Sequence, residues 1–221
     1  MKKTGLLLIT ALFSLTTLLA QKDEKVVYGD NVQKRSIGSF KAIDASSGIE
    51  VIITKGDKEE LAVSVSRPEF FDEVRTTVQN GVLKITRSND WNFWREWKNW
   101  RIKVYVSYTQ LEDLHASSGS TIKGTDLALD KLSAKLNSGA IITLSGTVNS
   151  LNVDGDSGAQ FHGYELSSTM CAAEASSGAG VQVNVSKEIS AKANSGGFIR
   201  FKGEGLIRDV NVNSGGSVKR S

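Results

Sequence analysis

The chain has 221 residues and a formal net charge of +3, and its single cysteine, Cys171, excludes an internal disulfide bond. A chain of this length can form one sizeable hydrophobic core or two modest ones. Because basic and acidic residues nearly balance, the composition gives no electrostatic reason to expect nucleic acid or an anionic membrane surface as a partner.

The first 20 residues have the pattern of a secretory signal peptide. Lys2 and Lys3 precede an apolar run over residues 5–19, and Ala20 is a small residue before a predicted cleavage at Gln21. Loss of the two lysines leaves a net charge of +1. No second apolar run of spanning length follows, so we expect an exported protein with no transmembrane segment in its mature chain. The periplasm, the outer-membrane surface and the extracellular space all fit; a permanent N-terminal anchor is the alternative.

Residues 21–112 are predicted to form a β-rich N-terminal part. Four runs alternate between apolar and polar residues and are predicted strands: Glu60–Ser66, Val74–Val78, Val82–Thr86 and Arg101–Ser107. Asn80-Gly81 between two of these runs predicts an antiparallel β-hairpin, and Pro68 is expected in a connection. No linker rich in Pro, Ser or Gly follows, so we expect this part to continue directly into residues 113–221.

The segment Asp90–Arg101, DWNFWREWKNWR, contains all four tryptophans of the chain. It is predicted to form a hairpin tip or a short helical turn. Flat aromatic side chains near Arg and Lys can stack on sugar rings or anchor a protein partner. The alternatives are that the tryptophans cover one side of the fold and bury their own rings, or that they insert into a membrane interface. The candidate ligand- or partner-binding residues are Trp91, Phe93, Trp94, Trp97 and Trp100.

A Ser-Gly motif recurs seven times along the chain. Its glycines are Gly48, Gly119, Gly139, Gly158, Gly178, Gly196 and Gly215. The last five steps are 20, 19, 20, 18 and 19 residues, and such a period is typical of a solenoid. The first step, of 71 residues, equals one repeat plus an insertion of about 52 residues.

Alignment on the glycine predicts the structure of each repeat. Apolar residues stand three positions after it, as in Ile142, and five positions before it, as in Ala134, with a polar column between. This period of two indicates a strand, a sharp corner and a second strand. The glycine provides the bend, and the Ser, Asn or Asp two positions before it is expected to satisfy the backbone of the corner. The fold class is therefore all-β: a right-handed parallel β-helix-like solenoid with an inserted antiparallel hairpin region.

A glycine-rich phosphate loop is the alternative for these motifs. Such loops precede a helix, whereas the alternation after each glycine indicates a strand, so the glycines are interpreted as structural corners.

Two outward-facing columns are candidates for function. The column four residues after each glycine leans basic and is interpreted as a solvated face, with an acidic polysaccharide as the alternative ligand; its members are Ile52, Lys123, Thr143, His162, Gln182, Arg200 and Lys219. In the other column, Asp154 and Glu174 are successive members at a separation that suits a retaining glycosidase. Their neighbours Lys135 and Lys192 instead indicate a charge-balanced ladder.

The sequence shows no metal-ligand cluster, nucleophilic triad or cofactor motif. His115 and His162 have no catalytic context, and Cys171 is interpreted as a buried, inert thiol. We therefore expect neither an enzyme nor a bound cofactor or metal.

The order of the motifs resembles a known family. A signal peptide is followed by SFKAIDASSGIEVIITKGDKEELAVSV, VQNGVLKIT, VYVSYTQLEDLHASSGSTI and repeated SG corners. This ordered set is similar to the head GIN domain family, described as auto-transporter adhesins of secreted bacterial proteins, over nearly the whole mature chain. The resemblance implies a β-helix-like fold and carries over no catalytic residues.

These observations lead to three functional hypotheses. The first is a secreted or cell-surface adhesion module that contacts a polysaccharide or a surface protein through the Trp-rich segment. The alternative is a structural envelope or assembly protein whose solenoid ends stack, which allows homo-oligomers. The least favoured is a polysaccharide-cleaving enzyme that uses Asp154 and Glu174.

Overall fold

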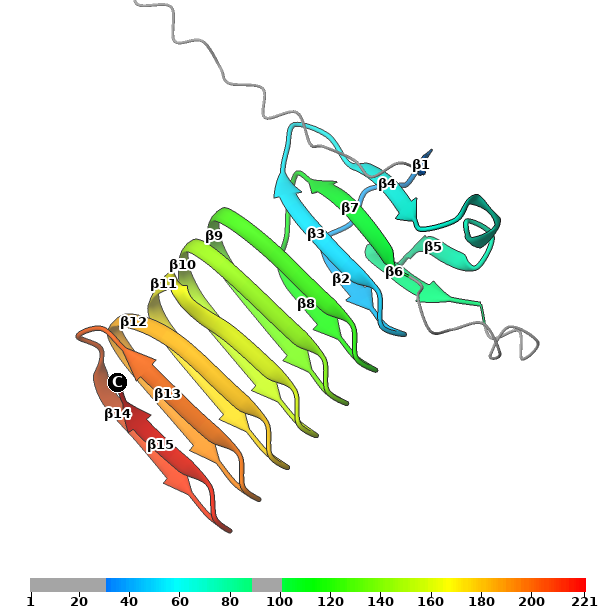
Figure 1. The fold of residues 1–221 in the computed structure, drawn as a ribbon. Coiled ribbons are helices and arrows are strands. Elements are labelled where there is room, and N and C mark those ends of the chain that lie inside the picture. The colour runs from blue at the N-terminus through cyan, green and yellow to red at the C-terminus, as the bar shows by residue number, and fades with distance from the viewer. Residues whose placement is uncertain (1–30, 89–100) are drawn as a thin grey trace, which may run out of the picture.

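The structure, a computed structural model, describes residues 31–88 and 101–221. The strands stack as parallel coils into an elongated solenoid, with the N-terminal strands at one end and the C-terminal strands at the other (Figure 1). The predicted parallel solenoid is therefore confirmed. Each coil contributes a strand segment to two opposite faces, called here the first face and the second face.

The first face follows the strand order β1-β4-β7-β3-β9-β10-β11-β12-β13-β15. Its strands are β1 (Val32–Arg35), β4 (Glu60–Val65), β7 (Ile102–Tyr108), β3 (Glu50–Lys55), β9 (Thr121–Leu136), β10 (Ile141–Gly155), β11 (Gln160–Ala175), β12 (Gly180–Ala193), β13 (Phe198–Lys202) and β15 (Ser217–Arg220). The second face contains the later halves of β9 to β12, and at its two ends β5 (Val74–Gln79), β6 (Val82–Arg87), β2 (Ala42–Ala45), β8 (Asp113–Ala116) and β14 (Leu206–Val212).

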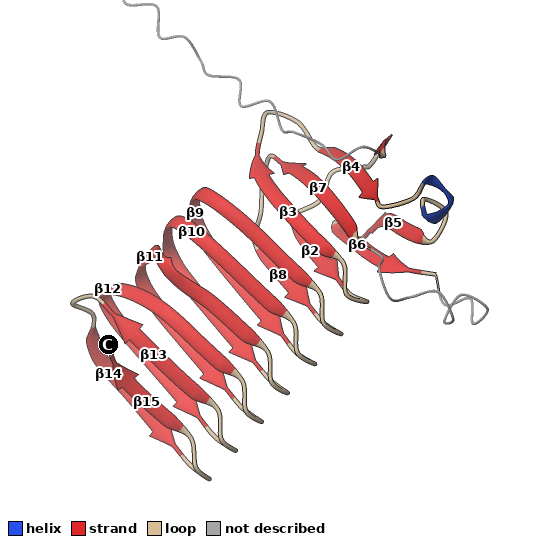
Figure 2. Ribbon diagram, viewed as in Figure 1, coloured by secondary structure: helices blue, strands red, loops and turns tan. Residues whose placement is uncertain are grey.

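The coils cross from the first face to the second in different ways at their two edges. At one edge the Ser-Gly corners form a row of tight loops (Figure 2). At the other edge β9 to β12 bend without ending. Each is therefore one continuous strand of 14 to 16 residues that runs through both faces. The bends coincide with shifts of the pairing register, for example between Leu144 and Gly146. Such bulges turn a strand without a loop.

At every corner the serine and the glycine both have a positive φ. Ser138 has φ 51° and Gly139 has φ 70°. Two successive left-handed residues define a type I′ turn, which the Ala140 N–H closes by donating to the Asn137 carbonyl at 3.1 Å. The sequence pattern predicts a bend made by the glycine alone, but the serine adopts the left-handed conformation as well.

The remaining backbone groups of the corners pair from coil to coil. The Gly139 N–H donates to the Ser157 carbonyl at 3.0 Å, and the Gly158 N–H donates in the same way to the Ser177 carbonyl at 3.1 Å. The side chain two positions before the glycine, which the sequence pattern predicts for this task, is therefore not the main partner. The backbone of the next coil provides most of the pairing, because stacking brings a carbonyl within reach of the glycine N–H at every corner but the last.

The core is the row of inward-facing side chains between the two faces. The predicted column that contains Ile142 is fully buried from Val51 to Ile199, and so is the column of Ala134 up to Ala191. The last coil differs, since Val210 is 40% exposed. The inner side chains of β14 have no further coil over them among the described residues.

The N-terminal part extends both faces. The predicted hairpin is confirmed: β5 and β6 pair antiparallel around Asn80 and Gly81, both of which have a positive φ. β4 pairs antiparallel with both β1 and β7. Pro68 begins a short 3₁₀ helix, η1 (Pro68–Phe70), between β4 and β5.

Candidate binding surfaces

The Trp-rich segment takes the place of a corner. β6 pairs parallel with β2 on the second face, and β7 pairs parallel with β3 on the first. In the register, Ile85 stands beside Ala45 and Lys103 stands beside Glu50. β2 and β3 are joined by the tight corner at residues 46–49, whereas the equivalent positions of β6 and β7 are joined by residues 86–102. This coil therefore carries an insertion at the corner edge.

The described residues that flank this segment are held by the backbone. The Ser88 N–H donates to the Glu73 carbonyl at 2.8 Å, and the Arg101 carbonyl accepts from the Ser66 N–H at 3.2 Å. The candidate binding residues themselves lie outside the described residues; they are Trp91, Phe93, Trp94, Trp97 and Trp100.

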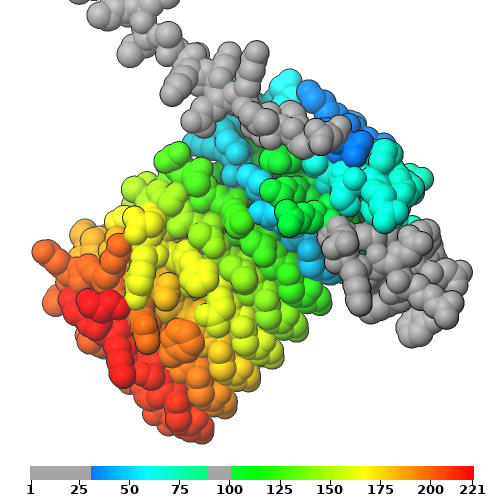
Figure 3. Space-filling view, in the orientation of Figure 1, coloured from blue at the N-terminus to red at the C-terminus, as the bar shows by residue number. Residues whose placement is uncertain are grey.

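The row of corners forms a regular ridge along the lower right edge in Figure 3. Asp156 is the one acidic residue among the seven residues that open the corners. Its Oδ2 accepts from the Ser157 hydroxyl at 2.7 Å and its Oδ1 accepts from the Ser176 hydroxyl at 2.5 Å. Hydrogen bonds from Ser157, Ser176 and Ser177 hold the pKa of the Asp156 carboxyl well below its usual range.

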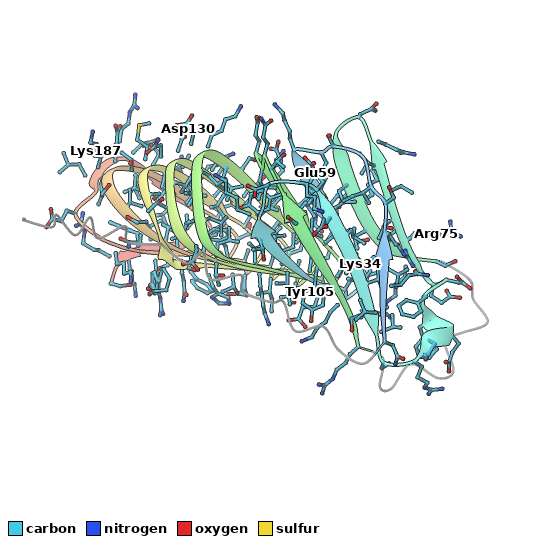
Figure 4. The ribbon with its side chains drawn as sticks, turned by 90° about the horizontal axis from the view of Figure 1, so that it is seen from above. Lys34, Glu59, Arg75, Tyr105, Asp130 and Lys187 are labelled. Atoms are coloured by element: carbon cyan, nitrogen blue, oxygen red, sulfur yellow. The ribbon has the colours of Figure 1, made fainter. Side chains whose placement is uncertain are left out.

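A cleft of about 400 Å³ lies beside β1, β4 and β7. Its lining includes Lys34, Ile37, Glu60 and Tyr105. Lys34 and Tyr105 are near each other at the N-terminal end of the stack (Figure 4). The volume falls within the range of small-ligand pockets. Nothing in the sequence pattern pointed to this cleft, because it depends on the antiparallel placement of β1 and β4.

Arg35 fixes one wall of the cleft. Its guanidinium donates to the Phe71 carbonyl at 2.6 Å and to the Val74 carbonyl. Partial burial lowers the pKa of Arg35, and the negative charge of Asp72 opposes this effect. The guanidinium is therefore used to tie β1 to the start of β5.

The outward columns predicted from the sequence are continuous ladders. Thr143, His162 and Gln182 are successive register partners on the first face, and Arg200 and Lys219 continue the row. A groove of about 270 Å³ lies over its middle.

The second column contains Asp154 and Glu174 as direct register partners. Glu174 forms an ion pair with Lys192 at 3.4 Å, and Lys135 is the register neighbour of Asp154 on the other side. The two adjacent carboxylates thus have a lysine on either side along this ladder. The pairing agrees with a charge-balanced ladder on the second face.

The two histidines and the cysteine have ordinary structural surroundings. His115 Nδ1 lies 3.1 Å from Asp44 Oδ1, and His162 Nδ1 lies 3.2 Å from Gln182 Oε1. Cys171 is buried, and burial raises the pKa of its thiol to about 12. A thiol with such a pKa is protonated at neutral pH and therefore unreactive.

Within residues 31–88 and 101–221, no three His, Cys, Asp or Glu side chains are grouped closely enough to hold a metal ion. The same ranges contain no helix with the length and apolar character needed to cross a bilayer.

The fold and its corner pattern match a known family. The model of the family described as "Putative auto-transporter adhesin, head GIN domain" matches residues 39–205, which is more than half of the chain. The chain belongs to this family. The match to the head GIN domain extends from β2 to the end of β13 and includes the coil that carries the Trp-rich segment. No curated protein matches the chain.

Solved structures share the head GIN fold at low sequence identity. A "putative adhesin" from Bacteroides fragilis NCTC 9343 is 15% identical with a TM-score of 0.65, covering 86% of this chain and 96% of that one. A "putative lipid binding protein" from Parabacteroides distasonis ATCC 8503 is 16% identical with a TM-score of 0.50 and the same coverage. At these identities the likeness shows the fold alone.

Proposed function

We propose that this head GIN protein is a surface adhesion module that contacts a polysaccharide or a surface protein through residues 91–100. The family description points to an exported or cell-surface location. The observation that carries the proposal is the topology of the coil formed by β6 and β7. A four-residue corner would join these strands, as it joins β2 and β3, yet the chain inserts a segment with all four tryptophans there.

The composition of the insertion supports a binding role over a packing role. Tryptophan and arginine are enriched among the residues that dominate binding energy at interfaces. The core between the two faces is formed by the inward columns of the coils. An aromatic segment at the edge of a rigid scaffold is a common arrangement for recognition.

Tryptophan fluorescence tests this proposal directly, because every tryptophan of the protein lies in the segment. The protein is titrated with a panel of bacterial and host polysaccharides and with purified cell-surface proteins. We expect at least one to shift the emission, and Trp94→Ala with Trp97→Ala to weaken that binding at least about tenfold, as loss of an aromatic anchor does. Lys135→Gln, on the second face, is the control and should bind normally. An unchanged emission with every probe, or full binding by the double variant, rejects the proposal.

A second candidate function is an envelope assembly protein, and the last coil favours it. Leu206 is 75% exposed and Ile207 is 54% exposed on β14, an edge strand that pairs only with β12 among the described strands. An apolar strand with unpaired backbone groups is a template for another strand. We expect a second copy to pair there in an isologous dimer. Light scattering that reports one monomer mass over a hundredfold range of concentration contradicts this candidate.

A further inference from the structure

The outer side of the first face carries a row of polar and basic side chains. Thr143, His162, Gln182, Arg200 and Lys219 follow one another in register, one on each coil from β10 to β15. Neighbouring strands in a sheet lie about 4.8 Å apart, so the row presents a polar group at each such step along the solenoid axis.

An aromatic ring lies on the sheet beside this row. A Cβ atom added to Gly180 would be 2.3 Å from Cζ of Phe198 and 2.4 Å from Oε1 of Gln160. The far end of the Phe198 ring therefore lies directly over the backbone of Gly180, on the neighbouring coil. Phe198 is only partly buried, so part of its ring is accessible. Phe198 and Gly180 are register partners, so the missing side chain of the glycine leaves room for the ring.

A second ring borders the row on its other side. The Tyr164 hydroxyl is 2.8 Å from the Ser221 hydroxyl, and the Lys202 ammonium lies 5.4 Å from the centre of the Tyr164 ring. Tyr164, His162 and Gln182 contribute to the groove of about 270 Å³ on this face. That groove is open and is smaller than most pockets that enclose a small molecule, which suits one unit of an extended ligand.

Two cations of the row have no carboxylate partner among the described residues. Lys202 pairs with Glu165 at 3.2 Å and Lys123 pairs with Glu50 at 2.8 Å. Arg200 and Lys219 form no ion pair with any described residue, and the Arg200 guanidinium instead lies 5.8 Å from the centre of the Phe198 ring. The positive charge without an ion-pair partner is thus concentrated in the C-terminal half of the row, next to the Phe198 ring.

We propose that this face binds an anionic, carboxylate-bearing polysaccharide that runs along the solenoid axis across β10 to β15. The apolar side of a sugar ring stacks on Phe198, and the planar guanidinium of Arg200 forms paired hydrogen bonds with a sugar carboxylate. Gln182, His162 and Thr143 offer donors and acceptors to the hydroxyls of the following units. The site is separate from the Trp-rich segment and does not rest on the function proposed above.

Binding of a uronic-acid polymer tests the inference. Polygalacturonate and alginate are titrated into the protein at constant ionic strength, with neutral dextran as the reference. We expect binding of the acidic polymers only, and about a tenfold loss with Arg200→Gln, because charge-assisted hydrogen bonds contribute more than neutral ones. Phe198→Ala should give a comparable loss. Gly180→Ala should also weaken binding, since its Cβ displaces the ring without changing any charge.

Two controls separate this site from general charge attraction and from the Trp-rich segment. Lys135→Gln removes one positive charge from the opposite face and should leave affinity within about twofold of the original. The Trp94→Ala, Trp97→Ala variant should bind the uronic-acid polymers normally. Equal losses with Lys135→Gln and Arg200→Gln, binding of dextran as strong as that of polygalacturonate, or preference for anionic lipid vesicles over the polymers would each overturn the proposal. Circular dichroism of every variant establishes that a loss of binding is not a loss of fold.

Discussion

Asp156 shows how one residue adapts a repeated corner. Three other corners open with asparagine at this position, namely Asn137, Asn194 and Asn213, so the turn itself does not need a charge. The carboxylate of Asp156 accepts from serine hydroxyls of its own corner and of the next. It therefore links two coils through charge-assisted hydrogen bonds, which are stronger than neutral ones.

Asp156→Asn should lower the free energy of unfolding at pH 7 without disturbing the corner. The native pKa of Asp156 lies below the value of about 3.9 for an unfolded aspartate, so the unfolded state binds more protons between the two values. The stabilising contribution is complete above the unfolded pKa and is lost as the pH falls through the window below it. Urea unfolding of both proteins between pH 7 and pH 3 should show the difference shrinking below about pH 4; a difference independent of pH would contradict the assignment.

At the scale of the element, the corner and the bend are two different ways in which the chain passes from one face to the other. The corner has a type I′ turn with two left-handed residues, whereas the bend has bulges whose positions vary from coil to coil. Gly139 at a corner and Gly146 at a bend both have a positive φ, but a Cβ at Gly139 meets nothing within 4 Å. A Cβ at Gly146 would lie 2.2 Å from the carbonyl oxygen of Leu127.

Alanine at these two glycines should therefore have different effects. Gly139→Ala introduces only the strain of a left-handed L-residue, about 1 kcal/mol. Gly146→Ala adds a clash with the backbone of the adjacent coil and should reduce the free energy of unfolding at least about twice as much. Equilibrium unfolding in urea measures both changes, and equal effects would show that the bend tolerates a side chain.

Sequence spacing could predict the corners but not the bends. Each corner repeats the same Ser-Gly pair at a nearly fixed period, and the register then follows from the columns of Ile142 and Ala134. The bends have no common motif: Asp126 has a positive φ in one coil and Gly146 in the next. Without a repeated residue type, the sequence suggests two strands where the structure has one bent strand.

The candidate binding surfaces could be predicted from the sequence only where they follow the repeat period. The row of Thr143 and His162 follows directly from the repeat and was identified as a column. Phe198 and Gly180 also share a column, and an aromatic residue one repeat after a glycine is a signal that can be read from the sequence. The cleft near Lys34 and Tyr105 could not be inferred, because it depends on antiparallel strands that do not follow the period.

At the scale of the whole molecule, the two ends of the solenoid differ. The N-terminal end is extended by antiparallel strands and the β5–β6 hairpin, which add strands to both faces. The C-terminal end exposes the inner side chains of β14, while Arg220 closes the side of the first face by donating to the Gly203 carbonyl at 2.8 Å and lying over the ring of Phe201. The insertion at residues 86–102 belongs to the extended end, and the coil that carries it has the same strand pairing as a coil with a corner.

The most direct test replaces residues 86–102 with Ser-Ser-Gly-Ile, the sequence of residues 46–49 that joins β2 to β3. Binding of the original and the shortened protein is compared on an array of glycans and purified cell-surface proteins, alongside circular dichroism and urea unfolding. We expect the shortened protein to keep its β-sheet spectrum and cooperative unfolding, and to lose every interaction of the original on this array except binding of uronic-acid polymers. A shortened protein that does not fold would contradict the equivalence of segment and corner, and one that folds and binds the same targets would contradict the role of the Trp-rich segment.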